Sequence, residues 1–212
     1  MKTLFRAGPA LAVTLAVAAL AACSPLPPQP ARFNPYQGLT PGGAVPAQAS
    51  LRPPIAGSGK SIALVVSDSS EKQFEYVEQV IATLKSGGYL YQSDVEQRGR
   101  PAYFSGQIVK KFQSRFARVQ LVDDFRAATT GGFDYVGLID IAIQKPLTTG
   151  TTYGYDIDVD ILTPGLQRIV ALKGRGLDNN RCPGAECHYA TDMRALTQAM
   201  DQFYAAFDAN IR

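Results

Sequence analysis

Hydrophobic and polar residues follow regular patterns over residues 61–212, and these patterns predict strands and helices in a definite order. The unbroken apolar run at 62–66 has the length of a strand that is buried on both faces. Ser70 and Gln73 have the spacing of a capping box, and apolar residues at helical intervals follow until two glycines at 87–88. We therefore expect a strand followed directly by an amphipathic helix.

The remaining pattern predicts a second helix, a meander and a closing helix. A helix from Ser105 leads into a short strand at 119–122, and 123–128 can form one helical turn. Three strands are then expected at 135–144, 152–162 and 167–177, followed by a helix from Asp192 with Thr191 as its N-cap. This order predicts an α+β fold, a mixed sheet of about five strands with helices on one face and an amphipathic C-terminal helix.

The first 22 residues have the pattern of a signal peptide and are excluded from the fold. Lys2 and Arg6 precede an apolar run at 10–20, which is shorter than the roughly 20 residues that a membrane span needs. Residues 20–23, Leu-Ala-Ala-Cys, resemble the lipobox of bacterial lipoproteins. The alternative is an ordinary secretory signal whose cleavage site happens to precede a cysteine.

The lipobox resemblance implies that Cys23 becomes the first residue of the mature chain and carries acyl chains such as palmitate. Several acyl chains together anchor a protein stably to a membrane. Position 24 is Ser rather than Asp, which in this class of lipoprotein implies transfer to the outer membrane. We therefore expect an outer-membrane lipoprotein on the periplasmic side, with the membrane as one partner.

Residues 23–60 differ in composition from the rest and are predicted to be a tether for the domain at 61–212. They contain nine of the 14 prolines, and proline favours the extended polyproline geometry. At about 3.1 Å per residue such a spacer could hold the domain up to ~110 Å from the membrane. The domain itself has 16 basic and 18 acidic residues, a balance that disfavours nucleic-acid binding.

The order of elements resembles a known group of periplasmic domains. The segment from 132–136 (Gly-Phe-Asp-Tyr-Val), the strand pair and the terminal helix are similar to those of the TolB amino-terminal domain, curli-secretion lipoproteins and lipoprotein activators of penicillin-binding proteins. This resemblance implies a TolB amino-terminal-like sandwich over 61–212 and assigns no functional residues. The chain has no spare pair of long strands for a membrane-spanning hairpin, so we do not expect a pore.

Three carboxylates, Asp156, Asp158 and Asp160, alternate with apolar residues and are expected on one face of a strand. The simplest interpretation is cross-strand charge pairing with Lys173 or Arg175. The alternative is a ligand-binding, ion-binding or hydrolase site, but calcium needs six to eight converging oxygens and glycoside cleavage needs an acid in an apolar pocket. No metal or other cofactor is predicted.

Two cysteines, Cys182 and Cys187, flank a Pro-Gly turn and are predicted to form a disulfide in the oxidising periplasm. Metal binding together with His188 would lack a fourth ligand, and a redox site would more usually have the spacing Cys-x-x-Cys. His188, the single histidine, is expected to be an exposed loop residue.

A long connection between the first two helices combines aromatic residues with arginines. Both residue types are enriched at protein-binding hot spots, and such long connections often carry function. The candidate partner-binding residues are Tyr89, Tyr91, Arg98, Arg100 and Tyr103. Alternatively, Tyr89, Tyr91, Tyr103 and Phe104 attach the connection to the core.

These observations favour a non-catalytic lipoprotein whose domain binds an envelope or cell-wall assembly protein. No set of nucleophile, base and orienting residue can be assembled without a usable histidine or a free cysteine, so an enzyme is not expected. The alternative is ligand or ion binding, or hydrolysis, on the Asp156, Asp158 and Asp160 face.

Overall fold

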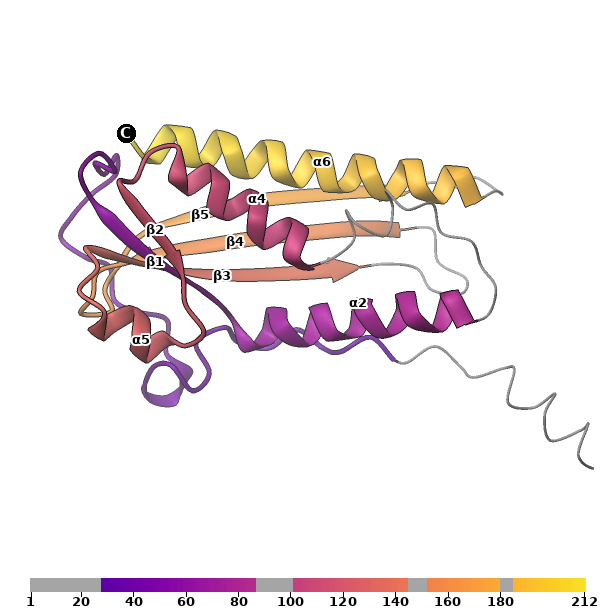
Figure 1. The fold of residues 1–212 in the computed structure, drawn as a ribbon, viewed down its shortest axis with the longest axis horizontal. Helices are drawn as coiled ribbons and strands as arrows, with labels where there is room; N and C mark the ends of the chain where they lie inside the picture. The colour runs from indigo at the N-terminus through magenta and orange to yellow at the C-terminus, as the bar shows by residue number, and fades with distance from the viewer. Residues whose placement is uncertain (1–27, 87–100, 145–151, 180–184) are drawn as a thin grey trace, which may run out of the picture.

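The computed structural model describes residues 28–86, 101–144, 152–179 and 185–212, and within them a single sheet with helices packed on it (Figure 1). The strands and helices follow the predicted order. They are β1 (Ser61–Val66), α2 (Asp68–Ser86), α4 (Pro101–Gln113), β2 (Arg118–Leu121), α5 (Phe125–Thr130), β3 (Tyr135–Gln144), β4 (Thr152–Leu162), β5 (Arg168–Asn179) and α6 (Ala185–Asn210). A 3-10 turn, η1 (Pro41–Gly43), precedes them.

The sheet is mixed and has five strands in the order β2-β1-β3-β4-β5. β1 pairs in parallel with both β2 and β3, and β3, β4 and β5 form an antiparallel meander. β1 is short and apolar because it lies between two neighbours and is covered on both faces. The predicted α+β class, the mixed five-stranded sheet and the C-terminal helix are therefore confirmed, and the five strands agree to within two residues at each end. The short helix α5 is an exception to the predicted placement of the helices, since it packs on the other face from the long helices.

The three long helices share one core with one face of the sheet. Apolar residues of α2, α4 and α6 pack against the isoleucines and tyrosines that alternate along β3 and β4. The largest of these buried side chains include Tyr155, Phe104, Phe112, Phe203 and Phe207. The hydroxyl of Tyr155 donates to Asp192 of α6 at 2.5 Å, so a buried polar link joins the sheet to the C-terminal helix across this core.

The C-terminal helix begins earlier than expected. α6 starts at Ala185, so Thr191 is inside the helix and is not its N-cap. Thr191 is fully buried, and its neighbour Asp192 accepts the bond from Tyr155. The predicted N-cap role of Thr191 is therefore wrong, and the next residue, Asp192, takes part in the contact between helix and sheet.

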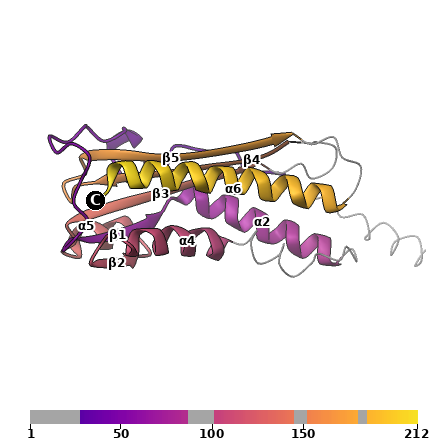
Figure 2. The ribbon, with the colours of Figure 1, turned by 90° about the horizontal axis from the view of Figure 1, so that it is seen from above.

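α6 lies unusually close to β5, along which it runs lengthwise in Figures 1 and 2. A Cβ at Gly176 would be 1.8 Å from the carbonyl oxygen of Ala195, and one at Gly174 would be 2.1 Å from that of Ala199. Only glycine permits such an approach. The side chains of Gln198 and Gln202 then accept bonds from the Leu177 and Arg175 N–H groups of this edge strand.

The opposite face of the sheet carries a smaller apolar cluster. Ala63, Val65, Val136 and Leu138 of the central strands pack against Phe125 and Ala128 of α5. Tyr36, from the segment before β1, completes this cluster and is only 2% exposed. The face that looks solvent-exposed from the strand pattern is thus partly covered by the N-terminal segment.

Candidate functional site

The three alternating carboxylates of β4 lie on the face of the sheet opposite the long helices. β4 and β5 are paired so that Asp156 is opposite Arg175 and Asp158 is opposite Lys173. The ion pairs measure 2.7 Å from Asp156 to Arg175 and 3.2 Å from Asp158 to Lys173. The predicted cross-strand charge pairing is therefore confirmed.

A fourth carboxylate, which the sequence analysis missed, joins this row from the neighbouring strand. Asp140 of β3 is opposite Asp158 and is only 2% exposed. Its Oδ1 accepts from the hydroxyls of Ser67 at 2.6 Å and Ser70 at 3.4 Å, just where α2 begins. A charged residue in the middle of an otherwise apolar buried strand was the available signal. We refer to Asp140, Asp156, Asp158 and Asp160 as the acidic strip.

Arg32, from the proline-rich segment, lies across the acidic strip. Its Nε and Nη2 donate to the same oxygen of Asp140 at 3.0 and 2.6 Å, and Nη2 also donates to Asp158 at 2.7 Å. Asp156 lies 3.5 Å from Nη1. Burial lowers the pKa of Arg32, but the hydrogen bonds to Asp140 and Asp158 outweigh it and the net shift is upward. One guanidinium thus neutralises a carboxylate that the sheet has buried.

Asp160 has a different partner, the hydroxyl of Tyr36, which donates to its Oδ2. Burial raises the pKa of the Asp160 carboxyl, and the bond from Tyr36 opposes that rise. Burial likewise raises the pKa of the Tyr36 hydroxyl, so the phenol keeps its proton. Arg168 lies at the outer limit of an ion pair, 4.0 Å from Asp160.

The segment that supplies Arg32 and Tyr36 is not the free spacer that its composition predicts. Residues 28–60, which we call the strap, run along the sheet from the end where β3 stops toward the carboxyl terminus (Figure 1). Polyproline-like backbone makes no hydrogen bonds with itself, which is why the sequence suggests a spacer. The same property leaves its side chains and backbone groups available to bind a neighbouring surface, and here they bind this domain.

A cavity of about 440 Å³ remains between the strap and the acidic strip. The charged residues of its wall are Asp140, Asp158, Asp160, Arg168 and Lys173 from the sheet and Arg32 from the strap. Positive and negative groups are interleaved, so the wall has no excess of either charge that would select a simple ion. Each acidic-strip carboxylate already has a cation or hydroxyl partner in the chain, which weakens the alternative of a catalytic or ion-binding acidic face.

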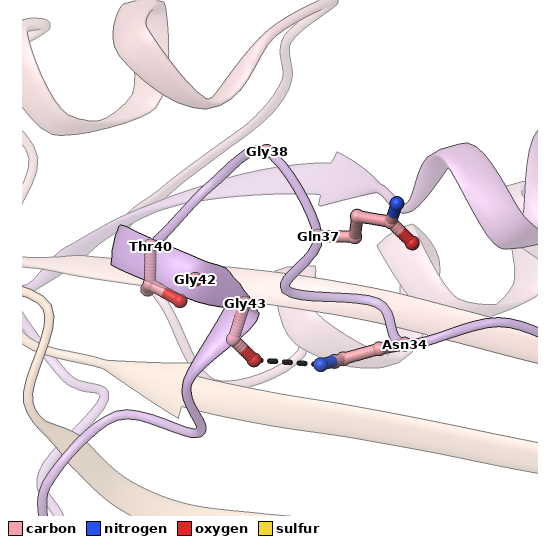
Figure 3. Close-up of a pocket in the computed structure, with 6 residues that line it drawn as sticks. All are labelled: Asn34, Gln37, Gly38, Thr40, Gly42 and Gly43. Carbon is pink, nitrogen blue, oxygen red and sulfur yellow. Dashed lines mark hydrogen bonds between the residues drawn. The ribbon is translucent and has the colours of Figure 1, made fainter.

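A second hollow lies within the strap itself, around the turn η1 (Figure 3). It measures about 450 Å³ and is lined by Asn34, Gln37, Gly38, Thr40, Gly42 and Gly43. The Asn34 side chain donates to the Gly43 carbonyl at 2.6 Å and closes the loop. Gly38, Gly42 and Gly43 all have positive φ, which a tight turn of this kind requires. The lining residues include no charged group, and the hollow is explained by the turn.

Most of the other predicted site residues lie outside the described parts of the chain. This applies to Cys23, Cys182, Tyr89, Tyr91, Arg98 and Arg100, while Cys187 and His188 fall within α6 in a stretch whose side chains are not described. Tyr103 lies in the first turns of α4, half-buried, with its ring edge-on to Phe104 at 6.2 Å. Phe104 is buried in the core, as expected if the end of the connection is attached there.

The described residues contain neither a metal cluster nor a membrane span. No group of three or more His, Cys, Asp or Glu side chains in these ranges is arranged to hold a metal ion. No helix among them is long and apolar enough to cross a membrane.

Comparison with known proteins gives only remote similarities. No protein-family model and no curated protein matches the chain. Among solved structures, two of a PelC dodecamer from Paraburkholderia phytofirmans are similar, one of them carrying a leucine-to-methionine substitution. The substituted form has 11% identity, a TM-score of 0.32 and coverage of 74% of this chain and 94% of that one. The other has 14% identity, a TM-score of 0.29 and coverage of 71% and 94%.

A third solved structure, lipoprotein GNA1162 from Neisseria meningitidis, is similar at 10% identity with a TM-score of 0.25. The match covers 67% of this chain and 99% of that one. The similarities are remote, so the function of this chain has to follow from its own residues.

Proposed function

We propose that this protein is a non-catalytic outer-membrane lipoprotein whose periplasmic domain is held close to the membrane and binds an envelope or cell-wall assembly protein. The lipobox at 20–23 supports the anchor, and Ser24 supports the outer membrane. The strap carries the new part of the proposal, because it sets how far the domain can be from its anchor.

The distance follows from where the strap first binds the domain. The side chain of Gln29 donates to the carbonyl of Ile143 near the end of β3, and the side chain of Gln73 donates to the carbonyl of Pro30 at 2.8 Å. The chain from Cys23 to Gln29 is six residues, which can span about 20 Å at most. With the strap bound, the end of the sheet where β3 stops therefore faces the membrane, and the reach is far below the ~110 Å of a free tether.

The anchor is tested by replacing the residue that would carry the lipid. Cys23→Ser should abolish metabolic palmitate labelling and release the protein from the membrane fraction, because only a thiol accepts the diacylglyceryl group. Ser24→Ala is the matched control and should remain labelled. Labelling that persists in Cys23→Ser would contradict the lipoprotein assignment.

The partner surface is tested by crosslinking the soluble domain in periplasmic extract. Arg98→Ala together with Arg100→Ala should weaken capture of a specific partner, because truncating hot-spot residues commonly costs about 2 kcal/mol or more of binding. Arg52→Ala with Arg126→Ala removes the same charge from exposed positions elsewhere and serves as the control. Equal capture by both double variants would place the partner surface elsewhere.

A further inference from the structure

The two halves of the strap are attached to the domain in different ways. The distal strap, residues 47–60, has side-chain bonds from Gln48 and Lys60, but it is also held to the domain by backbone hydrogen bonds that the described residues of the other half lack. Ala49 N–H donates to Arg168 O at 2.8 Å and Ile55 N–H donates to Asn210 O at 2.9 Å. Gly57 N–H also donates to the carbonyl of Arg212 at 2.7 Å. These contacts join the distal strap to β5 and to the end of α6 in the manner of short strand pairings.

The proximal strap, residues 28–46, is held through side chains. Its described hydrogen bonds to the domain each use a side chain on at least one partner: Gln29 with Ile143, Arg32 with the acidic strip, Phe33 N–H with Ser69, Tyr36 with Asp160, and Gln73 with Pro30. The Arg32 side chain is also 35% exposed, so water and competing cations can reach it.

We propose that the proximal strap is a releasable latch, and that the partner segment which releases it is cationic. On release the proximal strap detaches from the domain, while the distal strap, which has backbone hydrogen bonds, and the five-stranded sheet stay in place. The acidic strip and the adjoining apolar surface around Leu138 and Leu162 are then uncovered. The complementary occupant is an extended peptide with an arginine and a nearby aromatic residue, since Arg32 and Tyr36 fill the same positions.

The latch also changes the reach of the domain, a consequence that rests on the proposed lipid anchor. With the proximal strap bound, the free chain from Cys23 ends at Gln29 and spans about 20 Å. With it released, the free chain continues to Ala47, and 24 residues at about 3.1 Å each reach about 75 Å. A cationic partner segment would thus replace the strap and let the domain move away from the membrane in one event.

Amide hydrogen exchange on the unlipidated Cys23→Ser chain tests the latch. The amides of Leu39 and Thr40 bond to Tyr36 O inside the proximal strap. When Arg32→Ala is added to this chain, these two amides should exchange about tenfold faster or more. The amides of Ala49 and Ile55 should keep their rates. Arg52→Ala is the control, since it removes an exposed arginine of the distal strap, and it should change neither set.

Two results would overturn the latch. Unchanged Leu39 and Thr40 exchange in Arg32→Ala would show that the salt bridges do not hold the proximal strap. Equal acceleration of proximal, distal and sheet amides would show that the strap leaves only when the whole domain unfolds.

Competition and membrane measurements complete the test. Hexa-arginine added to the chain with Arg32 intact should accelerate exchange of the same proximal amides, and hexa-glutamate should not. No effect of hexa-arginine would refute release by a cation.

On a supported bilayer, neutron reflectometry should place the lipidated Arg32→Ala domain farther from the surface than the unchanged domain. Failure of the unchanged protein to attach to the bilayer would refute the anchor, while the exchange results would still decide the latch.

Discussion

Replacing Arg32 by Ala tests the main contact of the strap by measuring stability. The change leaves Oδ2 of Asp140 without both of its donors, while Oδ1 keeps the hydroxyls of Ser67 and Ser70. Breaking a fully buried ion pair by removing one partner costs about 3–5 kcal/mol. Arg32 is 35% exposed, so water can enter in its place, and we expect a smaller loss of about 2–3 kcal/mol in the free energy of unfolding.

A second process limits this loss. A domain that releases its proximal strap exposes Asp140 to water without unfolding. Arg32→Ala therefore cannot lower the free energy of unfolding by more than the bound proximal strap contributes to it. The contacts of Arg32 with Asp156 and Asp158 add little, because exposed pairs contribute at most about 1 kcal/mol. The buried carboxylate of Asp140 therefore decides the magnitude.

The assay is urea unfolding of the Cys23→Ser chain in a double-mutant cycle. Asp140→Asn keeps the shape of the side chain and removes its charge, so Arg32→Ala should cost about 1–2 kcal/mol less in the Asp140→Asn background. Arg52→Ala should change stability by less than about 0.5 kcal/mol, as exposed substitutions usually do. An equally small effect of Arg32→Ala, or no coupling between the two sites, would refute the assignment of Arg32 as the neutralising partner.

Three further outcomes follow from the structure. In thermal unfolding, Gly176→Ala should destabilise the domain by about 3 kcal/mol, because its Cβ would meet a helix carbonyl at 1.8 Å. Gly106→Ala is the matched control inside α4, where an added Cβ would meet nothing within 4 Å, and it should stabilise the domain by about 0.5–1 kcal/mol. Burial raises the folded-state pKa of Asp160 above 3.8. The free energy of unfolding that Asp160 contributes should therefore rise as the pH falls through this raised pKa and level off below 3.8. Asp160→Asn should remove that slope from melting temperatures measured between about pH 3 and 7, and an unchanged slope would contradict it. Reduction of the predicted Cys182–Cys187 disulfide should lower the free energy of unfolding by about 2 kcal/mol and the melting temperature modestly. Free thiols at both positions in periplasmic protein would rule the bridge out.

The sequence alone determined the elements and the direction in which their side chains point. Alternation with period two assigns Asp156 and Asp158 to one face of a strand and Ile157 and Val159 to the other, whatever the strand packs against. The facing of the side chains is a local consequence of spacing, and it was predicted correctly. Which cation lies opposite Asp158 is not set by the turn alone, because the register shifts between Ile161 and Leu162 and this shift brings Lys173 opposite Asp158.

Tertiary structure alone decided what covers the acidic face. The strap has no hydrophobic period, and proline content says only that it cannot form a helix or a central strand. Its decisive contact joins Arg32 to Asp140, which are 108 residues apart, and no local pattern specifies such a pair. The burial of Asp140 becomes tolerable only when the folded sheet places it beside an arginine, because a buried carboxylate needs a cation that no neighbouring position in its own strand supplies.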